Sequence, residues 1–293
     1  MLKGTTKNNG QKDKLDRFYT SPDEALRLLA SLPPVVPQLA ENPDCSGVEF
    51  YEPSAGDGAF VRAVEELYPS ASVRAFDIAP SPSPLCDTEI GEQDFLDADI
   101  PYSDNRIVIG NPPFGEQGRL CFQFVEKALV IAPTVCFILP PSFKKESYLK
   151  RLGLSPVAVI ELDDTAYRVG GGLIDVPSSF FVFDREHPFV EDEIDFGKLP
   201  FEFLPKNKAD SADFTIRRVG GTSGTANPDT SVSPQSNYFC RTCDGYDTDT
   251  IIDTINGIDF PERDWSVGPR SLSQREIARR VIEAMGGEPS GQE

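Results

Sequence analysis

The segment Asn111-Pro112-Pro113-Phe114 combines residue types that can act on an amino group attached to an aromatic ring. Such an amine is a poor nucleophile because its lone pair is delocalised into the ring. The Asn111 side-chain oxygen and the Pro112 carbonyl oxygen can accept its two hydrogens, draw the nitrogen toward tetrahedral geometry and stabilise the charge that develops on attack. Pro112 and Pro113 restrict the backbone and preorganise these acceptors, and Phe114 can stack on the ring. An amide is no general base, so we expect the surplus proton to leave to water.

A second segment reads as a strand, a glycine-rich turn and a helix start, and it contains Gly56 and Gly58. Glycines at such a turn let the chain bend sharply and let a ligand approach the backbone. A dinucleotide-binding fingerprint would have another glycine three residues after Gly58, where this sequence has a valine. The acids Glu52 and Asp57 would also repel a pyrophosphate. They suit a cationic ligand instead, such as the sulfonium and ammonium groups of S-adenosylmethionine.

Carboxylates also follow the next two expected strands. Asp77, with Ile78 beside it, ends the strand after the glycine-rich turn, where a carboxylate commonly accepts hydrogen bonds from ribose hydroxyls. Asp94 can accept a hydrogen bond from an adenine amine, and Phe95 can cover the adenine ring. The order and spacing of these residues predict one cofactor site. Asn111, which also follows an expected strand, should lie on the same rim of the sheet and contribute to this site.

The pattern of apolar residues predicts the elements that position this site. Strands are expected at 48–51, 73–78, just before Asp94, and at 107–109, 134–139, 157–162 and 179–183. Helices are expected at 59–68 and 120–131. Strands that alternate with helices predict a doubly wound, mostly parallel, seven-stranded Rossmann-like sheet. Residues 163–178, with glycines at 170–172, leave no room for a helix. We therefore expect an antiparallel hairpin at one edge of the sheet.

The chain divides by composition into three expected parts. Residues 1–16 are polar and aperiodic and predict a mobile tail, and residues 17–190 carry the α/β pattern. Within that part, Ser21 and Pro22 begin a helix that Pro33 and Pro34 end. Residues 191–293 form a C-terminal extension that could contribute to substrate recognition. It includes strand-like stretches at 214–219 and 237–241 and a helix at 271–285.

The charge of the chain bears on its partners. It has 47 acidic and 28 basic residues, a net charge of −19, which weighs against wide contact with phosphates. A groove lined by Lys144, Lys145, Arg217 and Arg218 could still hold a substrate, with Phe114 and Tyr167 holding a base flipped out of a duplex. A basic protein partner is also consistent with an acidic chain.

Neither a secretory signal nor an apolar run long enough for a bilayer is present. We therefore expect a soluble intracellular protein, in the cytoplasm or nucleus, that makes no membrane contact. Six cysteines in mostly apolar surroundings predict reduced thiols. Cys240 and Cys243 form a C-x-x-C pair without two further ligands nearby, so no metal site is expected.

Together the motifs resemble those of the amino-group methyltransferases, specifically the N6-adenine branch. Residues 52–60, Glu-Pro-Ser-Ala-Gly-Asp-Gly-Ala-Phe, resemble the family's cofactor motif, which adds Ala55 to the expected site, and Asn111–Phe114 resembles its catalytic motif. Residues 18–22, Phe-Tyr-Thr-Ser-Pro, resemble the segment that covers the methionine end of the cofactor, which implies roles for Tyr19 and Thr20. The resemblance implies S-adenosylmethionine as cofactor and methyl transfer to the N6 amine of adenine in DNA or RNA.

Two alternatives stay open at this point. A protein glutamine N-methyltransferase faces the same lone-pair problem at a side-chain amide, although that branch usually ends its motif in tyrosine, where this chain has Phe114. A non-catalytic, methyltransferase-like partner subunit is the other alternative. The sequence leaves open the choice between DNA and RNA, the recognition sequence and the oligomeric state.

Overall fold

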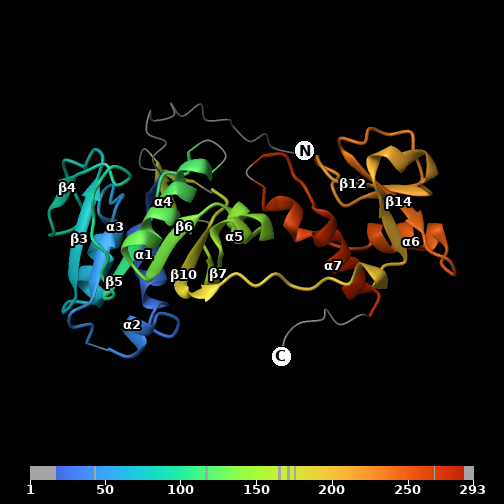
Figure 1. The fold of residues 1–293 in the computed structure, drawn as a ribbon. Helices are drawn as coiled ribbons and strands as arrows, with labels where there is room; N and C mark the ends of the chain where they lie inside the picture. Colours follow the sequence, from blue (N-terminus) through green and yellow to red (C-terminus); the bar gives the residue numbers. More distant parts are fainter. Residues whose placement is uncertain are drawn as a thin grey trace. The chain divides into compact units, whose positions relative to one another are not determined.

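The computed structural model describes residues 18–286, except residues 43, 116–117, 164–165, 170–171, 175 and 267. The expected tail at 1–16 lies outside these residues. The chain forms two compact units (Figure 1). The first contains residues up to 140 and residues 154–188, and the second contains residues 141–153 and 189 onward. The sequence placed one boundary at 190; the short segment 141–153, which follows the strand that ends at Leu139, packs with the second unit.

The first unit is built on a seven-stranded sheet. Its strands, in spatial order, are β4 (Ile90–Glu92), β3 (Ser72–Asp77), β2 (Glu49–Glu52), β5 (Arg106–Gly110), β6 (Thr134–Leu139), β10 (Ser179–Pro188) and β7 (Leu154–Glu161). Neighbours from β4 to β6 pair in parallel, whereas β10 is antiparallel to both β6 and β7. The structure thus confirms the doubly wound, mostly parallel sheet with an antiparallel hairpin at one edge.

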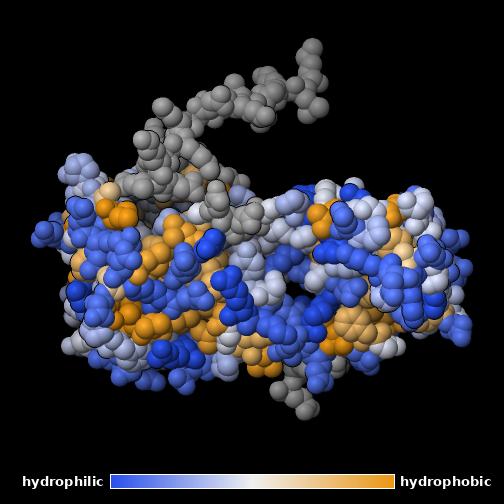
Figure 2. Space-filling view, turned by 45° about the horizontal axis from the view of Figure 1, so that its top comes forward, coloured by the Kyte–Doolittle hydropathy of each residue, from blue (hydrophilic) through white to orange (hydrophobic). Residues whose placement is uncertain are grey.

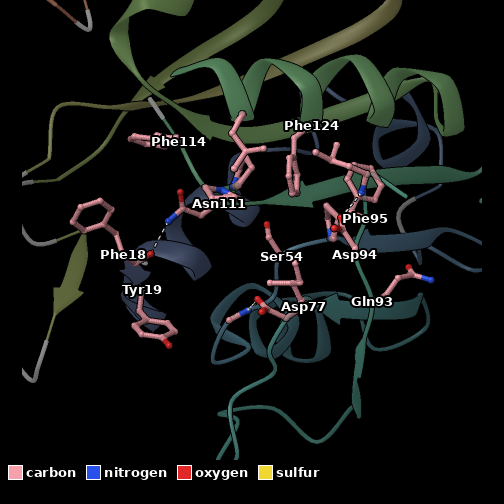
Figure 3. Close-up of a pocket in the computed structure, with 18 residues that line it drawn as sticks. Phe18, Tyr19, Ser54, Asp77, Gln93, Asp94, Phe95, Asn111, Phe114 and Phe124 are labelled. Carbon is pink, nitrogen blue, oxygen red and sulfur yellow. Dashed lines mark hydrogen bonds between the residues drawn. The ribbon is translucent and has the colours of Figure 1, made fainter. Parts of the chain in front are cut away.

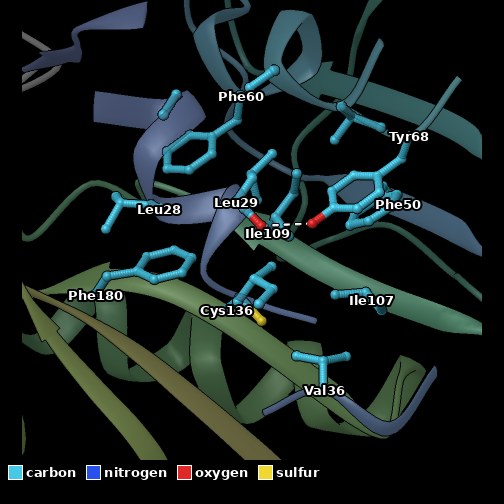
Figure 4. Close-up of a cluster of buried hydrophobic side chains, with 14 of the residues drawn as sticks. Leu28, Leu29, Val36, Phe50, Phe60, Tyr68, Ile107, Ile109, Cys136 and Phe180 are labelled. Carbon is cyan, nitrogen blue, oxygen red and sulfur yellow. Dashed lines mark hydrogen bonds between the residues drawn. The ribbon is translucent and has the colours of Figure 1, made fainter. Parts of the chain in front are cut away.

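Helices cover both faces of this sheet. On one face α1 (Pro22–Ala30) and α3 (Ala59–Leu67) pack over inward-facing side chains of the central strands (Figure 4). On the other face Phe124 of α4 (Arg119–Ile131) packs against Phe95, which in turn contacts Tyr51 of β2. All residues of β5 and β6 are buried. Strands buried on both faces carry apolar residues at most positions, which is why these segments, after Arg106 and Thr134, read as short apolar runs.

The local sequence explains where the two helices of the first face begin. Ser21 precedes α1 and its side chain accepts a hydrogen bond from the backbone N–H of Glu24, while Pro22 occupies the first turn. A short helix, α2 (Pro37–Ala40), follows and contributes Leu39 to the same core. The α3 helix begins after Gly58, so its N-terminus lies at the glycine-rich turn.

A three-stranded sheet lies beside the large one. It contains β1 (Tyr19–Thr20), β8 (Tyr167–Val169) and β9 (Gly172–Ile174), and β8 pairs antiparallel with both neighbours. The sequence pattern treated residues 163–178 as a simple connection between two strands. Instead, part of this connection pairs with the segment just before α1, and Gly170 and Gly171 lie outside the described residues.

The second unit has its own sheet and apolar core. Its strands, in spatial order, are β11 (Phe201–Leu204), β14 (Asn237–Thr242), β12 (Phe214–Arg217) and β13 (Ala226–Asn227). Its helices are α5 (Glu146–Leu152), α6 (Thr248–Asn256) and α7 (Gln274–Ala284). Short 3-10 turns lie at Pro141–Lys144, Phe196–Lys198, Lys206–Ser211 and Pro261–Asp264. The helix expected at 271–285 is α7, which Ser273 and Glu276 begin with a capping box. The strand-like stretches at 214–219 and 237–241 become β12 and β14.

The surface is mainly polar. Figure 2 shows hydrophilic residues over much of the face in view, with smaller hydrophobic areas between them, in line with a net charge of −19. Within the described ranges, no helix combines the length and the apolar character that crossing a bilayer requires.

Candidate active site

A pocket of about 390 Å³ opens beside the ends of β2, β3 and β5 in the first unit (Figure 3). Ligands of open α/β sheets bind at this place, outside the carboxyl ends of the strands. The pocket is lined by Phe18, Tyr19, Pro53, Ser54, Gly56, Asp77, Ile78, Gln93, Asp94, Phe95, Leu96, Asn111, Pro112, Pro113, Phe114, Gly115, Leu120 and Phe124. The structure therefore brings the glycine-rich turn, both expected carboxylates and the Asn-Pro-Pro-Phe segment to one cavity.

The glycine-rich turn after β2 needs its two glycines. Gly56 has φ of 56° and Gly58 has φ of 84°, values at which a side chain is strained. A Cβ atom on Gly56 would lie 3.2 Å from the Tyr19 ring, and one on Gly58 would lie 2.5 Å from Cys86 Sγ. Gly58 lines no described part of the pocket; it begins α3. The structure shows that Gly58 turns the backbone, and its expected contact with the cofactor stays a prediction.

Asp77 fixes this turn from the neighbouring strand. One of its carboxylate oxygens accepts the backbone N–H of Gly56 at 2.8 Å, and the other accepts that of Ala79 at 2.8 Å. The side chain is buried but lines the pocket. A carboxylate has about four acceptor sites, so Asp77 can anchor the turn and still accept from a ligand hydroxyl. Ile78, beside it, is exposed and also lines the pocket.

Glu52 is a buried carboxyl group that accepts a hydrogen bond from the backbone of Val61 but has one unsatisfied oxygen. Only 2% of the residue is exposed, and its Oε2 atom forms no hydrogen bond. Burial, together with the charges of Asp77 and Asp57, raises the pKa of Glu52 well above its usual value. Glu52 faces a cavity of about 30 Å³ that Tyr19, Thr20, Ala55, Gly56 and Asn111 also line. A cationic ligand beside Glu52 would stabilise the ionised form of this buried carboxyl group.

Asp57 differs from Glu52 because a cation already pairs with it. An Nη atom of Arg168, on β8, lies 2.9 Å from Asp57 Oδ2. Burial raises the pKa of Asp57, and the Arg168 guanidinium opposes that rise. The sequence grouped Glu52 and Asp57 as two acids for a cationic ligand. The structure leaves one oxygen of Glu52 without a hydrogen bond and neutralises Asp57 with an arginine.

Asn111 has its side-chain amide held in one orientation. Its Nδ2 atom donates to the Phe18 backbone oxygen at 3.0 Å and to Thr20 Oγ1 at 3.3 Å (Figure 3). With the nitrogen committed to these two acceptors, the Oδ1 atom remains to accept a hydrogen from an incoming amine. The segment before α1 therefore orients the residue that the sequence predicts to be catalytic.

Aromatic rings form the opposite part of the pocket wall. Phe95 and Phe124 lie with ring centroids 5.2 Å apart, and Figure 3 shows Phe124 projecting from α4. Asp94 Oδ1 accepts the backbone N–H of Leu96 at 2.9 Å, which turns the chain after β4. Phe114 is half-buried and borders both the pocket and the core. This wall can cover a flat ring, with Asp94 beside it as an acceptor.

The sequence missed several residues of this wall. Leu120 and Phe124 sit on α4, where helical spacing indicates core packing only. Gln93 belongs to no motif, and Ser54 lies inside the cofactor motif without having been singled out. Gln93 Oε1 accepts the hydroxyl of Tyr51 at 2.8 Å. Arg168 also went unnoticed, because its contact with Asp57 joins residues 111 positions apart in the chain. The periodicity of a single segment cannot show such a pair.

Tyr167 does not face the pocket, contrary to our expectation that it holds a flipped base. It is 1% exposed, and its hydroxyl lies 2.6 Å from Ser178 Oγ. Its ring packs edge-on against Phe18, with centroids 6.1 Å apart. A tyrosine enclosed in this way cannot stack on a substrate. Tyr167 instead packs against Phe18, which lines the pocket.

The four basic residues expected on the rim lie in the second unit, and none of them lines the pocket. Lys145 is 12% exposed and pairs with Glu276 at 3.2 Å, and it also donates to the Ser271 carbonyl. Arg217 donates to the Val219 carbonyl, and Arg218 lies over the Tyr238 ring. Lys144 ends the 3-10 turn before α5. Lys145, Arg217 and Arg218 thus make contacts inside the second unit, and a substrate role for them stays a prediction.

Cysteines do not build a metal centre in the described part of the chain. Cys240 is buried in β14 and Cys243 follows that strand. Among residues whose placement is described, no group of three or more histidine, cysteine, aspartate or glutamate side chains could hold a metal ion.

Comparisons with known proteins find similarity in structure only. No family model and no curated protein matches the sequence. A candidate RNA methyltransferase from Pyrococcus horikoshii is 18% identical, with a TM-score of 0.41 over 58% of this chain and 87% of that one. A type I restriction-modification methyltransferase subunit from Streptococcus thermophilus is 14% identical, with a TM-score of 0.43 over 62% and 47%. A SAM-dependent methyltransferase from Aquifex aeolicus is 12% identical, with a TM-score of 0.35 over 57% and 98%. Likeness at these identities concerns the fold alone.

Proposed function

We propose that this protein transfers a methyl group from S-adenosylmethionine to the N6 amino group of adenine in DNA or RNA. The observation that carries the proposal is the held amide of Asn111, with its Nδ2 bound to Phe18 and Thr20 at the edge of an acid-lined pocket. An acceptor oxygen fixed next to a site for a cationic cofactor is the arrangement that methylation of an aromatic amine needs.

The residues of the pocket and of the smaller cavity fit S-adenosylmethionine. The buried Glu52, in the smaller cavity, offers its unsatisfied oxygen Oε2 to a cationic part of the molecule. Asp77 offers acceptors for ribose hydroxyls, and Asp94 with Phe95 offers an acceptor and an aromatic ring for adenine. Tyr19 and Thr20 border the smaller cavity next to Glu52. When bound, this cofactor supplies an electrophilic methyl group.

The chain's own residues then act on the acceptor amine. Asn111 Oδ1 and the Pro112 carbonyl oxygen accept its two hydrogens, which localises the lone pair on nitrogen. The same oxygens stabilise the positive charge that builds up there, and they need no rearrangement because the amide is already held. Phe114 offers a ring face to the base. The proton that the product amine sheds passes to water, since neither an amide nor a peptide oxygen is a base at neutral pH.

Transfer of label from S-adenosylmethionine tests this proposal against its alternatives. The purified protein is incubated with methyl-labelled cofactor and, separately, with DNA, RNA and protein fractions. Label in adenine of a nucleic acid supports the proposal, while label in glutamine of a protein would favour the glutamine methyltransferase. Absence of cofactor binding in calorimetry would favour a non-catalytic subunit and contradict the proposal.

A further inference from the structure

Arg168 joins two segments that border the smaller cavity and are distant in the sequence. One of its Nη atoms donates to Asp57 Oδ2 at 2.9 Å and to the backbone oxygen of Thr20 at 3.0 Å. Asp57 belongs to the glycine-rich turn, and Thr20 belongs to β1. The Arg168 side chain is 32% exposed and that of Asp57 is 19% exposed, so the pair is shielded from much of the solvent.

The contacts continue from Thr20 to the predicted catalytic residue. Thr20 Oγ1 accepts a hydrogen bond from Asn111 Nδ2, and the adjacent Phe18 carbonyl accepts another. The backbone of β1 is itself held by pairing with β8, in a register that places Tyr19 opposite Arg168. Arg168 therefore contacts the cofactor turn directly and contacts Asn111 through one intermediate residue.

We infer that Arg168 is a positioning residue that holds the glycine-rich turn and β1 together, so that cofactor and acceptor amine meet at Asn111. This inference rests on the proposed function and adds a residue that the sequence motifs do not include. A guanidinium suits this task because its planar donors are fixed relative to one another, whereas a lysine ammonium is a flexible point charge. Arg168 also sets the charge of the site, since it neutralises Asp57, whereas the Oε2 atom of Glu52 has no hydrogen-bond partner.

Removal of Arg168 would change the protonation of the acidic groups near it, which are Asp57, Glu52 and Asp77. Glu52, at the end of β2, interacts with Asp57, and Asp77 lies next to Glu52 on β3. Arg168 is the cation that lowers the pKa of Asp57. Without it, burial would raise the pKa of Asp57 further, so more of this group would be protonated before a cationic ligand binds. Binding would then release more protons than in the native protein.

The test compares the native protein with Arg168→Ala, Arg168→Lys and Arg185→Ala. Arg185, on β10, donates to the Leu129 carbonyl at 2.7 Å and lies over the Tyr102 ring, so its replacement removes comparable contacts away from the pocket. Calorimetry with S-adenosylmethionine in buffers of different ionisation enthalpy gives the affinity and the number of protons released. We expect Arg168→Ala to bind about tenfold more weakly and to turn over about tenfold more slowly, as loss of charge-assisted hydrogen bonds predicts. It should also release more protons, while Arg168→Lys should be intermediate.

A second variant keeps the inference open to refutation if Arg168→Ala folds poorly. Asp57→Asn leaves an amide that can still accept a hydrogen bond. The double variant Asp57→Asn with Arg168→Lys should lose less cofactor affinity than the two single variants lose together, because the two residues act through one contact. Native affinity and proton release in Arg168→Ala, or effects no larger than those of Arg185→Ala, would overturn the inference. If the native protein binds the cofactor but methylates no nucleic acid, the proposed function fails while the binding comparison still tests Arg168. A native protein that does not bind S-adenosylmethionine would contradict both.

Discussion

The side-chain amide of Asn111 donates a hydrogen bond of 3.0 Å to the backbone oxygen of Phe18, which lies 93 residues earlier in the chain. This bond joins the end of β5 to the segment before α1, and it orients Asn111 by fixing which amide atom is left for a substrate. The predicted catalytic group is thus held by a backbone atom that no side-chain substitution removes.

Replacing Asn111 by alanine should abolish most turnover and leave cofactor binding nearly intact. The acceptor oxygen is lost, and stabilisation of a developing charge by one preorganised group is worth on the order of a hundredfold in rate. Glu52, Asp77 and Asp94 are unchanged, so calorimetry should give a dissociation constant close to that of the native protein. A variant with native turnover would exclude the proposed role of Asn111.

Replacing Thr20 by valine removes the acceptor for one of the two Asn111 bonds while keeping the shape of the side chain. Because the Phe18 oxygen still holds the amide, we expect turnover to fall by only about three- to tenfold, the worth of one hydrogen bond. Thr134→Val is a matched control, since Thr134 is also buried and bonds Gln38 at 3.1 Å away from the pocket. Equal turnover in the two variants would show that the Thr20 hydroxyl does not position Asn111.

At pH values above the ordinary glutamate pKa, Glu52→Gln should be more stable than the native protein. The same change should weaken cofactor binding. The pKa of Glu52 in the folded protein is raised well above 4.5 by burial and by two neighbouring acids. Between those two values the folded state binds more protons than the unfolded state, so the native free energy of unfolding falls as pH rises through this window. Glutamine does not ionise, so the free energy of unfolding of the variant does not fall in this pH window. Thermal melts of both proteins across the window should diverge with increasing pH, and parallel curves would contradict the prediction.

Replacing Tyr167 by phenylalanine should lower stability and spare activity. The change removes a buried hydrogen bond to Ser178, which costs about 1 kcal/mol of unfolding free energy. The ring that supports Phe18 is kept. Denaturant unfolding measures the first effect and steady-state kinetics the second. A large rise in the substrate KM without loss of stability would restore our original hypothesis that Tyr167 contacts the base.

The sequence predicts most of the sheet and the core of the site. The apolar run at 134–139 is too short for a typical helix and fits a strand buried on both faces. The turn at Gly56 follows from the positions of the glycines after a strand. Asn111, Asp77 and Asp94 could be placed together because parallel strands end at the same edge.

Other features depend on contacts between distant segments. The pairing of β8 with β1 leaves no periodic signal in either short strand. Tyr167 and Arg168 are neighbours in the sequence, yet one is enclosed by Ser178 and Phe18 while the other reaches Asp57. Segment 141–153 joins the second unit through ion pairs such as Arg275 with Glu146 at 2.8 Å, which composition cannot reveal.

Mass spectrometry of nucleosides decides whether Asn111 serves adenine methylation. DNA and RNA lacking the modification are incubated with S-adenosylmethionine and either the native protein or Asn111→Ala, then digested to nucleosides. We expect N6-methylated adenosine or deoxyadenosine with the native protein and almost none with the variant. Methylated nucleosides in equal amounts with both proteins, or a methyl group found on another base, would contradict the role derived from the Asn111 geometry.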